Sequence, residues 1–246
     1  MKYLIIGASS GLGREIAYSF AKRGHDLILV ARDERDLSSV KSDLKLKYNV
    51  NIKTISLDFS NDEELQTKLL SDENVLNNLS GVLFPVGFMF EKDNSSLDKS
   101  KINKVLKTNY LSISFLISKL LEKQIEKNFL IVGFGSVSGL LGRNININYA
   151  AAKRALESFF ESLAFEDKNK NIKIQFYTLG YLDTNLSFGK KLILPKGNVL
   201  RLAEIVYKNK EKKFLKMYYP FFWSFIAFIL KVIPIGLIIK LKNFIK

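Results

Sequence analysis

Short apolar runs alternate along this chain with longer segments in which apolar residues recur at helical spacing. Apolar runs bounded by polar residues indicate buried strands, whereas apolar residues at i, i+3 and i+4 indicate amphipathic helices. Six strands are predicted, at residues 3–6, 27–30, 52–57, 82–84, 129–132 and 172–178. Helices are predicted at residues 12–23, 34–48, 61–70, 102–125, 149–167 and 199–210. This alternation predicts an α/β fold in which helices flank a doubly wound parallel sheet.

The end of the chain follows a different pattern. Residues 217–239 contain Lys231 as their one charged side chain, and a straight helix of this length could cross a bilayer. However, Pro234 would break that helix, and Lys231 would lie near the bilayer centre. We therefore divide the chain into a folded catalytic domain at residues 1–213 and a hydrophobic helical appendage at residues 214–246.

The appendage is predicted to lie on a membrane surface. Two apolar helices, at residues 221–233 and 235–245, would place aromatic side chains at the headgroups, namely Tyr218, Tyr219 and Trp223. Basic residues flank the apolar segment on both sides, and such residues prefer the cytoplasmic side. The alternative is that these helices pack against a partner subunit of a homo-oligomer.

The net charge of +14 comes mainly from the end of the chain. Residues 190–246 hold 13 basic and two acidic residues, whereas residues 1–189 hold 25 basic and 22 acidic ones. Because the same region is the most apolar one, we expect an anionic membrane as partner and no nucleic acid. Met1 leads directly into a strand without an apolar leader, so a cytoplasmic protein at the cytoplasmic face of the membrane is expected.

Metal and thiol chemistry have little support in the composition. The chain has no cysteine and a single histidine, His25. A thiolate site, a cysteine nucleophile and a multi-histidine metal centre are therefore excluded, and no metal is predicted.

A glycine-rich turn stands where the first strand meets the first helix. The helix start leaves backbone N–H groups free to bind a diphosphate, and glycine allows both positive φ and close approach of the backbone. This position predicts a Rossmann-type dinucleotide site. The predicted binding residues of this turn are Gly7, Ser9, Ser10, Gly11, Leu12 and Gly13.

Tyr149 and Lys153 are one helical turn apart, so their side chains share a face. An isolated tyrosine has a pKa of roughly 10, too high for a general base near neutrality. A neighbouring ammonium favours the phenolate and lowers that pKa, which would allow the phenol to move protons during hydride transfer.

These motifs resemble the short-chain dehydrogenase/reductase family, which has a T-G-x3-G-x-G turn and a Y-x3-K pair. Ile6 replaces the usual threonine. The resemblance implies catalytic roles for Asn109, Ser136, Tyr149 and Lys153. It assigns Ser136 to a hydrogen bond with the reacting oxygen and Asn109 to a water chain that leads from the lysine.

The resemblance also implies how the cofactor is chosen. An acid after the second strand binds the free 2′-hydroxyl, whereas a base binds a 2′-phosphate. Arg32 is the first residue after the second strand that could reach the ribose, so NADP(H) is preferred. The alternative is that Asp33 selects NAD(H). Further cofactor contacts are implied at Asp58, Phe59, Gly87, Tyr149, Lys153, Gly180, Leu182 and Thr184.

Two stretches depart from the family pattern. Phe84-Pro85-Val86-Gly87 replaces N-N-A-G, so packing or backbone groups must brace the neighbouring strands. Leu179 replaces the proline of P-G-x-V-x-T, and residues 183–198 are expected to form a segment over the carboxyl edge of the sheet.

The predicted function is hydride transfer between NADP(H) and a ketone or secondary alcohol. The apolar end of the chain resembles a membrane-associated branch of the family that contains reductases of polyprenyl-phosphate-linked keto-sugars, which implies a lipid-linked substrate. A 3-oxoacyl or keto-sphingoid reductase is one alternative. A non-catalytic NADP-binding scaffold at the membrane is the other.

Overall fold

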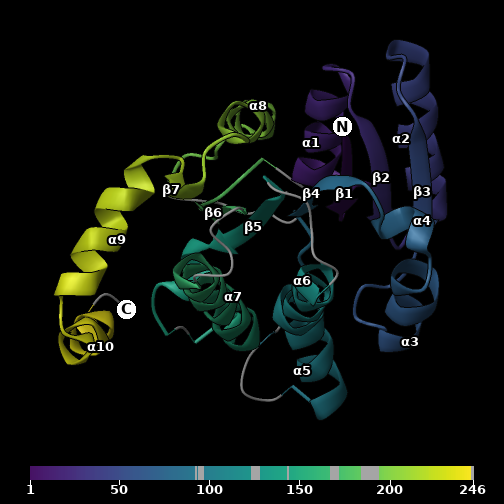
Figure 1. Cartoon of the computed structure of the whole chain (residues 1–246). Coiled ribbons are helices and arrows are strands. Elements are labelled where there is room, and N and C mark those ends of the chain that lie inside the picture. The colour runs from purple at the N-terminus through teal and green to yellow at the C-terminus, as the bar shows by residue number, and fades with distance from the viewer. Residues whose placement is uncertain are drawn as a thin grey trace.

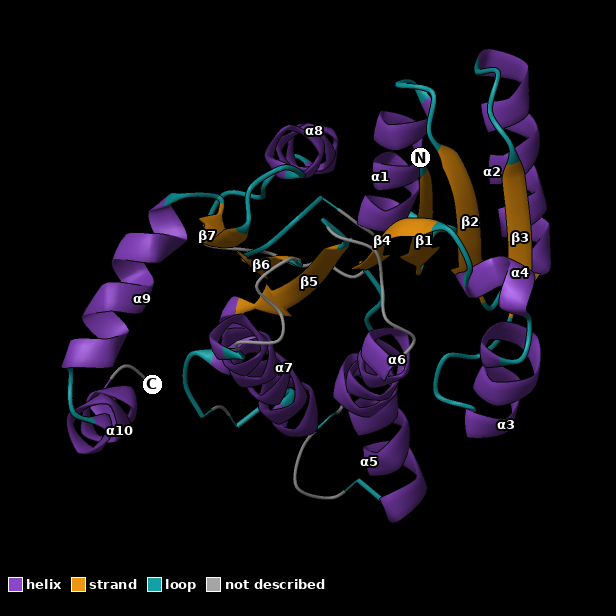
Figure 2. Cartoon of the chain, viewed as in Figure 1, coloured by secondary structure: helices purple, strands orange, loops and turns teal. Residues whose placement is uncertain are grey.

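Within the described residues, seven parallel strands form one sheet in the order β3-β2-β1-β4-β5-β6-β7 (Figure 2). The computed structural model describes residues 1–91, 93, 97–122, 128–142, 144–166, 172–183 and 194–244. The strand order turns back between β1 and β4, and ligands bind at such a switch point. The predicted Rossmann-type doubly wound sheet is therefore confirmed. Its strands are β1 (Lys2–Ile6), β2 (Asp26–Ala31), β3 (Ile52–Ser56), β4 (Leu79–Phe84), β5 (Leu130–Ser136), β6 (Lys173–Leu179) and β7 (Phe214–Tyr219).

Helices cover both faces of the sheet (Figure 1). One face is covered by α1 (Gly11–Ala21), α2 (Glu34–Lys47) and α8 (Val199–Asn209). The other face is covered by α5 (Lys99–Leu106), α6 (Ser112–Glu122) and α7 (Ile147–Phe165), with the π-helix η2 (Lys107–Leu111) between α5 and α6. Shorter elements are α3 (Asp62–Glu64), η1 (Leu65–Leu70), α4 (Glu73–Leu76) and the 3-10 helix η3 (Val137–Gly139). Each face buries its own apolar cluster.

Strand β5 is longer than the sequence pattern predicts. The apolar run predicts an end at 132, and the next residues include Gly133 and Gly135, a residue type that usually weakens a strand. In the structure these glycines continue the pairing with β6 up to Ser136. The space that a Cβ would need is filled by the ring of Phe160 at Gly133 and by the ring of Phe176 at Gly135.

Strand β7 was not predicted as a strand. Residues 214–219 were assigned to the appendage, but they pair in parallel with β6 from Phe214 to Tyr219. Lys216 extends from β7 to α7, where its ammonium lies 2.6 Å from a carboxylate oxygen of Glu157 and also contacts Glu161. The sheet thus extends past the predicted domain end at 213.

After β7 the chain forms α9 (Phe222–Val232) and α10 (Ile235–Phe244), close to the two helices expected there. Trp223 and Ala227 of α9 are buried against the domain. The indole of Trp223 occupies the space that a Cβ on Gly180 would need. Among the described residues, no helix has the length and apolar character that a membrane crossing requires.

Candidate active site

The glycine turn connects β1 to α1 in a tightly packed conformation. Gly7 has a φ of 96° and Gly11 a φ of 49°, both in the left-handed region that favours glycine. A Cβ on Gly7 would lie 2.8 Å from the Cα of Val86, and a Cβ on Gly13 would lie 1.9 Å from the carbonyl oxygen of Gly7. Any side chain at Gly7 or Gly13 would therefore deform the turn.

The first turn of α1 has backbone N–H groups from which an anion could accept hydrogen bonds. Ser10 is the residue that precedes the helix, and its side chain makes no capping hydrogen bond. No acidic residue lies in the first turn. The backbone N–H groups at this helix start, which include those of Leu12 and Gly13, have no acceptor within the helix. The turn therefore fits a diphosphate, because helix N-termini favour negative charge.

Lys153 is buried beneath the carboxyl edge of the sheet, with 3% of its surface exposed. Its ammonium donates a hydrogen bond to the Phe134 carbonyl at 3.0 Å and lies 3.5 Å from the Val86 carbonyl oxygen. The nitrogen is 5.8 Å from the centre of the Tyr149 ring. Burial lowers the pKa of Lys153 from 10.5 to about 8, so the side chain is still mostly protonated at pH 7. The structure thus places a cation beside the phenol.

Ser136 is the last residue of β5, and η3 begins directly after it. Its hydroxyl oxygen accepts the N–H of Ser138 at 3.1 Å, which leaves the hydroxyl proton of Ser136 available to a substrate oxygen. A Cβ on Gly139 would lie 3.1 Å from the backbone nitrogen of Arg154. The Ser136 segment is therefore packed against the same turn of α7 that carries Tyr149 and Lys153.

Asn109 lies in the π-helix η2 and is fully buried. Its amide nitrogen donates to the carbonyls of Phe88 at 2.6 Å and Val105 at 2.8 Å, and its amide oxygen accepts the Phe88 N–H at 3.2 Å. A Cβ on Gly87 would lie 3.5 Å from this oxygen and 3.8 Å from the Lys153 nitrogen. Asn109, Gly87 and Lys153 are thus brought together.

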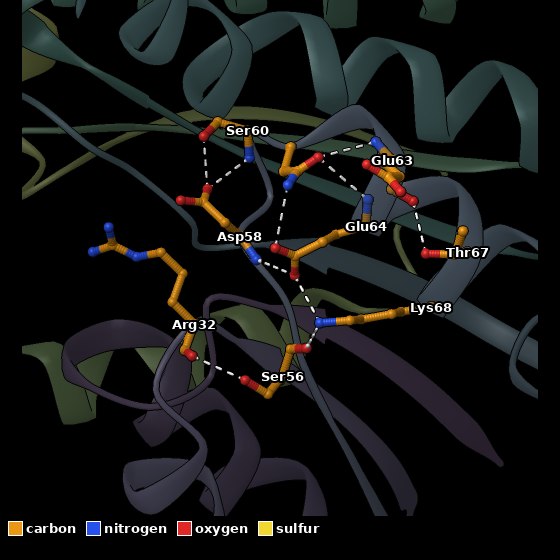
Figure 3. Close-up of polar contacts among 9 residues, drawn as sticks. Arg32, Ser56, Asp58, Ser60, Glu63, Glu64, Thr67 and Lys68 are labelled. Carbon is orange, nitrogen blue, oxygen red and sulfur yellow. Dashed lines mark hydrogen bonds and ion pairs between the residues drawn. The ribbon is translucent and has the colours of Figure 1, made fainter.

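Arg32 and Asp58 follow adjacent strands, as Figure 3 shows. The carbonyl of Arg32 accepts the Ser56 hydroxyl, and its guanidinium points away from Glu64. Among the described residues this guanidinium has no carboxylate partner, and its carbon lies 5.6 Å from the centre of the Phe88 ring. By contrast, the Asp33 carboxylate caps α2 by accepting the Asp36 N–H at 3.0 Å.

The Asp58 carboxylate is already bound on both oxygens. One oxygen accepts the N–H and the hydroxyl of Ser60, and the other lies 3.3 Å from the Lys104 ammonium. Burial alone would raise the pKa of Asp58, but these hydrogen bonds and the Lys104 charge outweigh it and hold the pKa below its usual range. The neighbouring Phe59 ring is buried in the core near Phe84.

The segment after β6 begins next to Ser136, because the last residues of β5 and β6 are paired. Gly180 donates its N–H to the Tyr219 carbonyl at 2.8 Å. Leu182 is buried and forms a parallel bridge with Gly197. Thr184 and residues 185–193 of the expected covering segment lie outside the described residues.

Two residues near the site were not predicted from the sequence. Phe88 supplies the backbone groups that bind Asn109, and Asp93 accepts hydrogen bonds from the first turn of α7. Phe88 directly follows Gly87, which was predicted to contact the cofactor, and this position was the only sequence signal for Phe88. Asp93 stands in a polar stretch with no motif, and its contact is 56 residues away at Tyr149.

A doubly wound sheet with a glycine turn and a tyrosine–lysine pair at its carboxyl edge defines a dinucleotide-dependent oxidoreductase class. Residues 2–191 match the sequence profile of the short chain dehydrogenase family. The chain therefore belongs to this family.

Several characterised proteins are similar to the chain. The very-long-chain 3-oxoacyl-CoA reductase of Rattus norvegicus is 31% identical over 78% of this chain and 63% of its own length. The hydroxysteroid 11-beta-dehydrogenase 1-like protein B of Xenopus laevis is 29% identical over 93% of this chain and 80% of its own length. The chain spans about half of the very-long-chain 3-oxoacyl-CoA reductase of Vanderwaltozyma polyspora, namely 55%.

Solved structures show the same fold. The bulky-bulky ketone specific alcohol dehydrogenase from Comamonas testosteroni has a TM-score of 0.76 at 25% identity, covering 89% of this chain and 86% of that chain. A short-chain dehydrogenase from Sphingobium yanoikuyae in complex with NADPH has a TM-score of 0.75 at 24% identity, covering 89% of this chain and 87% of that chain.

Burial of the Lys153 ammonium is expected to lower the stability of the folded protein while supporting its activity. Lowering the pKa of Lys153 from 10.5 to about 8 costs the folded protein on the order of 3 kcal/mol at neutral pH. This cost is complete below pH 8 and disappears as the pH approaches 10.5, because the unfolded chain then also loses the proton. Lys153→Met removes this cost but also takes the lysine donor from the Phe134 and Val86 carbonyls, so we expect a small net gain of about 1 kcal/mol at pH 7.

Urea unfolding at pH 7 and at pH 10 measures this difference. The Lys153→Met protein should be more stable at pH 7, lose that advantage by pH 10 and have no reductase activity. Lys45→Met, at an exposed position on α2, is the control and should change stability little at either pH. The difference in unfolding free energy between Lys153→Met and wild type is measured at both pH values. If this difference favours the variant less at pH 7 than at pH 10, burial of the Lys153 charge does not destabilise the fold.

Proposed function

We propose that this protein transfers hydride between NADP(H) and a ketone or secondary alcohol carried on a long-chain or lipid-linked molecule. The observation that carries the proposal is the packing at the start of α7. There the Lys153 ammonium stands beside the Tyr149 ring, and the segment that follows Ser136 lies against the same helical turn.

In the proposed reduction, bound NADPH supplies the hydride to the carbonyl carbon. The Tyr149 phenol donates a proton to the carbonyl oxygen, and the Ser136 hydroxyl donates a hydrogen bond to that oxygen. The Lys153 ammonium stabilises the phenolate that remains. In the oxidative direction the phenolate accepts the proton of the alcohol.

NADP(H) is proposed rather than NAD(H) because of the side chains after β2. The Arg32 guanidinium has no carboxylate partner among the described residues and can bind a 2′-phosphate through two N–H groups. Asp33, the residue that would favour NAD(H), already binds the Asp36 N–H at the start of α2. The similar Sphingobium protein was solved in complex with NADPH, which agrees with this choice.

A long apolar substrate is proposed from two observations. Similar proteins are named very-long-chain 3-oxoacyl-CoA reductases, which favours a 3-oxoacyl thioester as one substrate class. In addition, the helices after β7 carry an apolar surface beside the segment that contains Gly180. A polyprenyl-phosphate-linked keto-sugar is the second candidate class, since it too presents a ketone on a lipid.

We propose that α9 and α10 lie on the cytoplasmic face of a membrane. Trp223 and Ala227 bind α9 to the domain, whereas Phe225 and Phe228 on the opposite side are 68% and 67% exposed. Val232 and the α10 residues Ile235 and Leu237 extend this apolar surface. The net charge of +11 for residues 190–246 would add attraction to anionic lipids.

The reductase assay uses purified wild-type protein, NADPH and a panel of ketones: long-chain 3-oxoacyl thioesters, polyprenyl-phosphate-linked keto-sugars and short soluble ketones. Tyr149→Phe should lower kcat at least about 100-fold, since it removes the proton donor. Tyr48→Phe, at the far end of α2, is the control. Turnover of short ketones alone would contradict the proposed long-chain or lipid-linked substrate. NADPH binding without turnover of any ketone would favour a non-catalytic NADP-binding scaffold.

Cofactor choice is tested with Arg32→Ala. Losing a charge-assisted contact should raise the KM for NADPH roughly 10- to 100-fold and leave the KM for NADH nearly unchanged. Arg35→Ala, at an exposed position in α2, serves as the control. Equal losses with both cofactors would argue against contact between Arg32 and the 2′-phosphate.

Membrane binding is tested by sedimentation with vesicles of phosphatidylcholine alone or mixed with phosphatidylglycerol. Phe225→Glu and Phe228→Glu should each lower the vesicle partition coefficient more than tenfold, because burial of a phenylalanine contributes about 1.5–3 kcal/mol. Phe165→Glu, at an 88% exposed site on α7, is the matched control. If these variants instead abolish self-association and leave vesicle binding intact, the helices form a subunit interface.

A further inference from the structure

The first turn of α7, which carries Tyr149, has no ordinary cap. Asn146 precedes the helix in a left-handed conformation with a φ of 55°, and its side chain makes no capping hydrogen bond. The first N–H groups of any helix have no acceptor within the helix, and a short side chain at the position before it usually binds one of them. The N–H groups of this turn therefore need an acceptor from elsewhere in the chain.

Asp93 accepts the N–H groups of three successive residues at this helix start. Its backbone carbonyl accepts the Ile147 N–H at 3.1 Å. Its carboxylate accepts the Asn148 N–H at 3.1 Å and the Asn148 side-chain amide at 2.8 Å on one oxygen. The other oxygen accepts the Tyr149 N–H at 2.7 Å. Only 1% of Asp93 is exposed, so water does not compete for these bonds.

These bonds act on the residue that the proposed reaction depends on. The carboxylate holds the backbone of Tyr149 directly, and hydrogen bonds to a charged acceptor are about twice as strong as neutral ones. Because the Cβ direction follows from the backbone, the same bonds set where the phenol stands relative to Lys153, one turn further along α7. A negative charge at this helix start is also favoured by the helix dipole.

Asp93 lies in the same connection that holds the rest of the site. This connection follows β4, and within it Val86 contacts the Lys153 ammonium and Phe88 binds Asn109. Asp93 is five residues after Phe88 and binds the start of α7. One stretch of chain therefore contacts the lysine, the asparagine and the tyrosine.

We infer that Asp93 is a positioning residue for Tyr149, in addition to any contribution it makes to the stability of α7. This inference rests on the proposed function, in which Tyr149 transfers the proton. A merely structural cap would change the stability of α7 and, apart from the effect of its own charge, leave the acidity of the Tyr149 phenol unchanged. A positioning residue must change both the acidity of the phenol and the rate.

The experiment compares wild type, Asp93→Ala and Asp93→Asn. In Asp93→Ala, kcat should fall about 10- to 100-fold, as expected when a catalytic group moves by about 1 Å, while the KM for the ketone changes less than kcat. Asp93→Asn retains one acceptor oxygen and should recover part of the loss. Asn198→Ala removes the cap of α8 on the opposite face of the sheet and should leave kcat within about twofold, because a cap contributes only stability there.

A second measurement does not depend on turnover. Ultraviolet difference titration of each protein against its Tyr149→Phe counterpart reports the pKa of the Tyr149 phenol alone. Removing the Asp93 charge by itself lowers this pKa in both variants, because a nearby negative charge disfavours the phenolate. We therefore expect the pKa to be at least about half a unit higher in Asp93→Ala than in Asp93→Asn, since the phenol moves away from the Lys153 ammonium only in the alanine variant. Asp93→Ser replaces Asp93→Ala if the latter does not fold.

The outcomes separate this inference from the proposed function. An unchanged phenol pKa and an unchanged kcat in a folded Asp93 variant would overturn the positioning role. A wild-type protein that reduces no ketone, together with a phenol pKa that shifts in the Asp93 variants, would remove the proposed function and retain the role of Asp93 in placing Tyr149.

Discussion

The ammonium of Lys153, buried against two backbone carbonyls, is the contact on which the arrangement of the site depends. A charge is costly to bury unless its hydrogen bonds are made, and here the acceptors are Phe134 in β5 and Val86 after β4. Both carbonyls lie at the carboxyl ends of adjacent parallel strands. The lysine therefore ties α7 to this edge of the sheet, and Tyr149 on the same helix is brought to the edge where the glycine turn lies.

The connection after β4 holds the neighbouring segments in place through backbone groups and packing, whereas the usual family pattern uses polar side chains. Val86 packs against Gly7, and Pro85 approaches Gly13, so the unusual Phe84-Pro85-Val86-Gly87 sequence still braces the turn. The residues that follow bind Asn109 and the start of α7 through hydrogen bonds. Residues 84–87 thus depart from the family motif but still support the glycine turn, because this support requires packing contacts and not particular side chains.

The end of the chain is more closely joined to the domain than its composition indicates. Strand β7 extends the sheet, and Lys216 in that strand contacts Glu157 of α7. Trp223 then packs α9 against Gly180, in the segment that borders the site. Strand β7 therefore contacts α7 directly, and α9 contacts the segment that follows β6.

The sequence by itself determined the alternation of strands and helices, the glycine turn and the tyrosine–lysine spacing, because these depend on local periodicity and on residues close together in the chain. It did not determine where β5 ends, since Gly133 and Gly135 are kept in the strand by rings from Phe160 and Phe176. Nor did it reveal β7, whose apolar residues equally fit a membrane segment, or the contact of Asp93 with Tyr149. Only the tertiary structure decided these features, because each depends on a partner that the fold brings from a distant part of the chain.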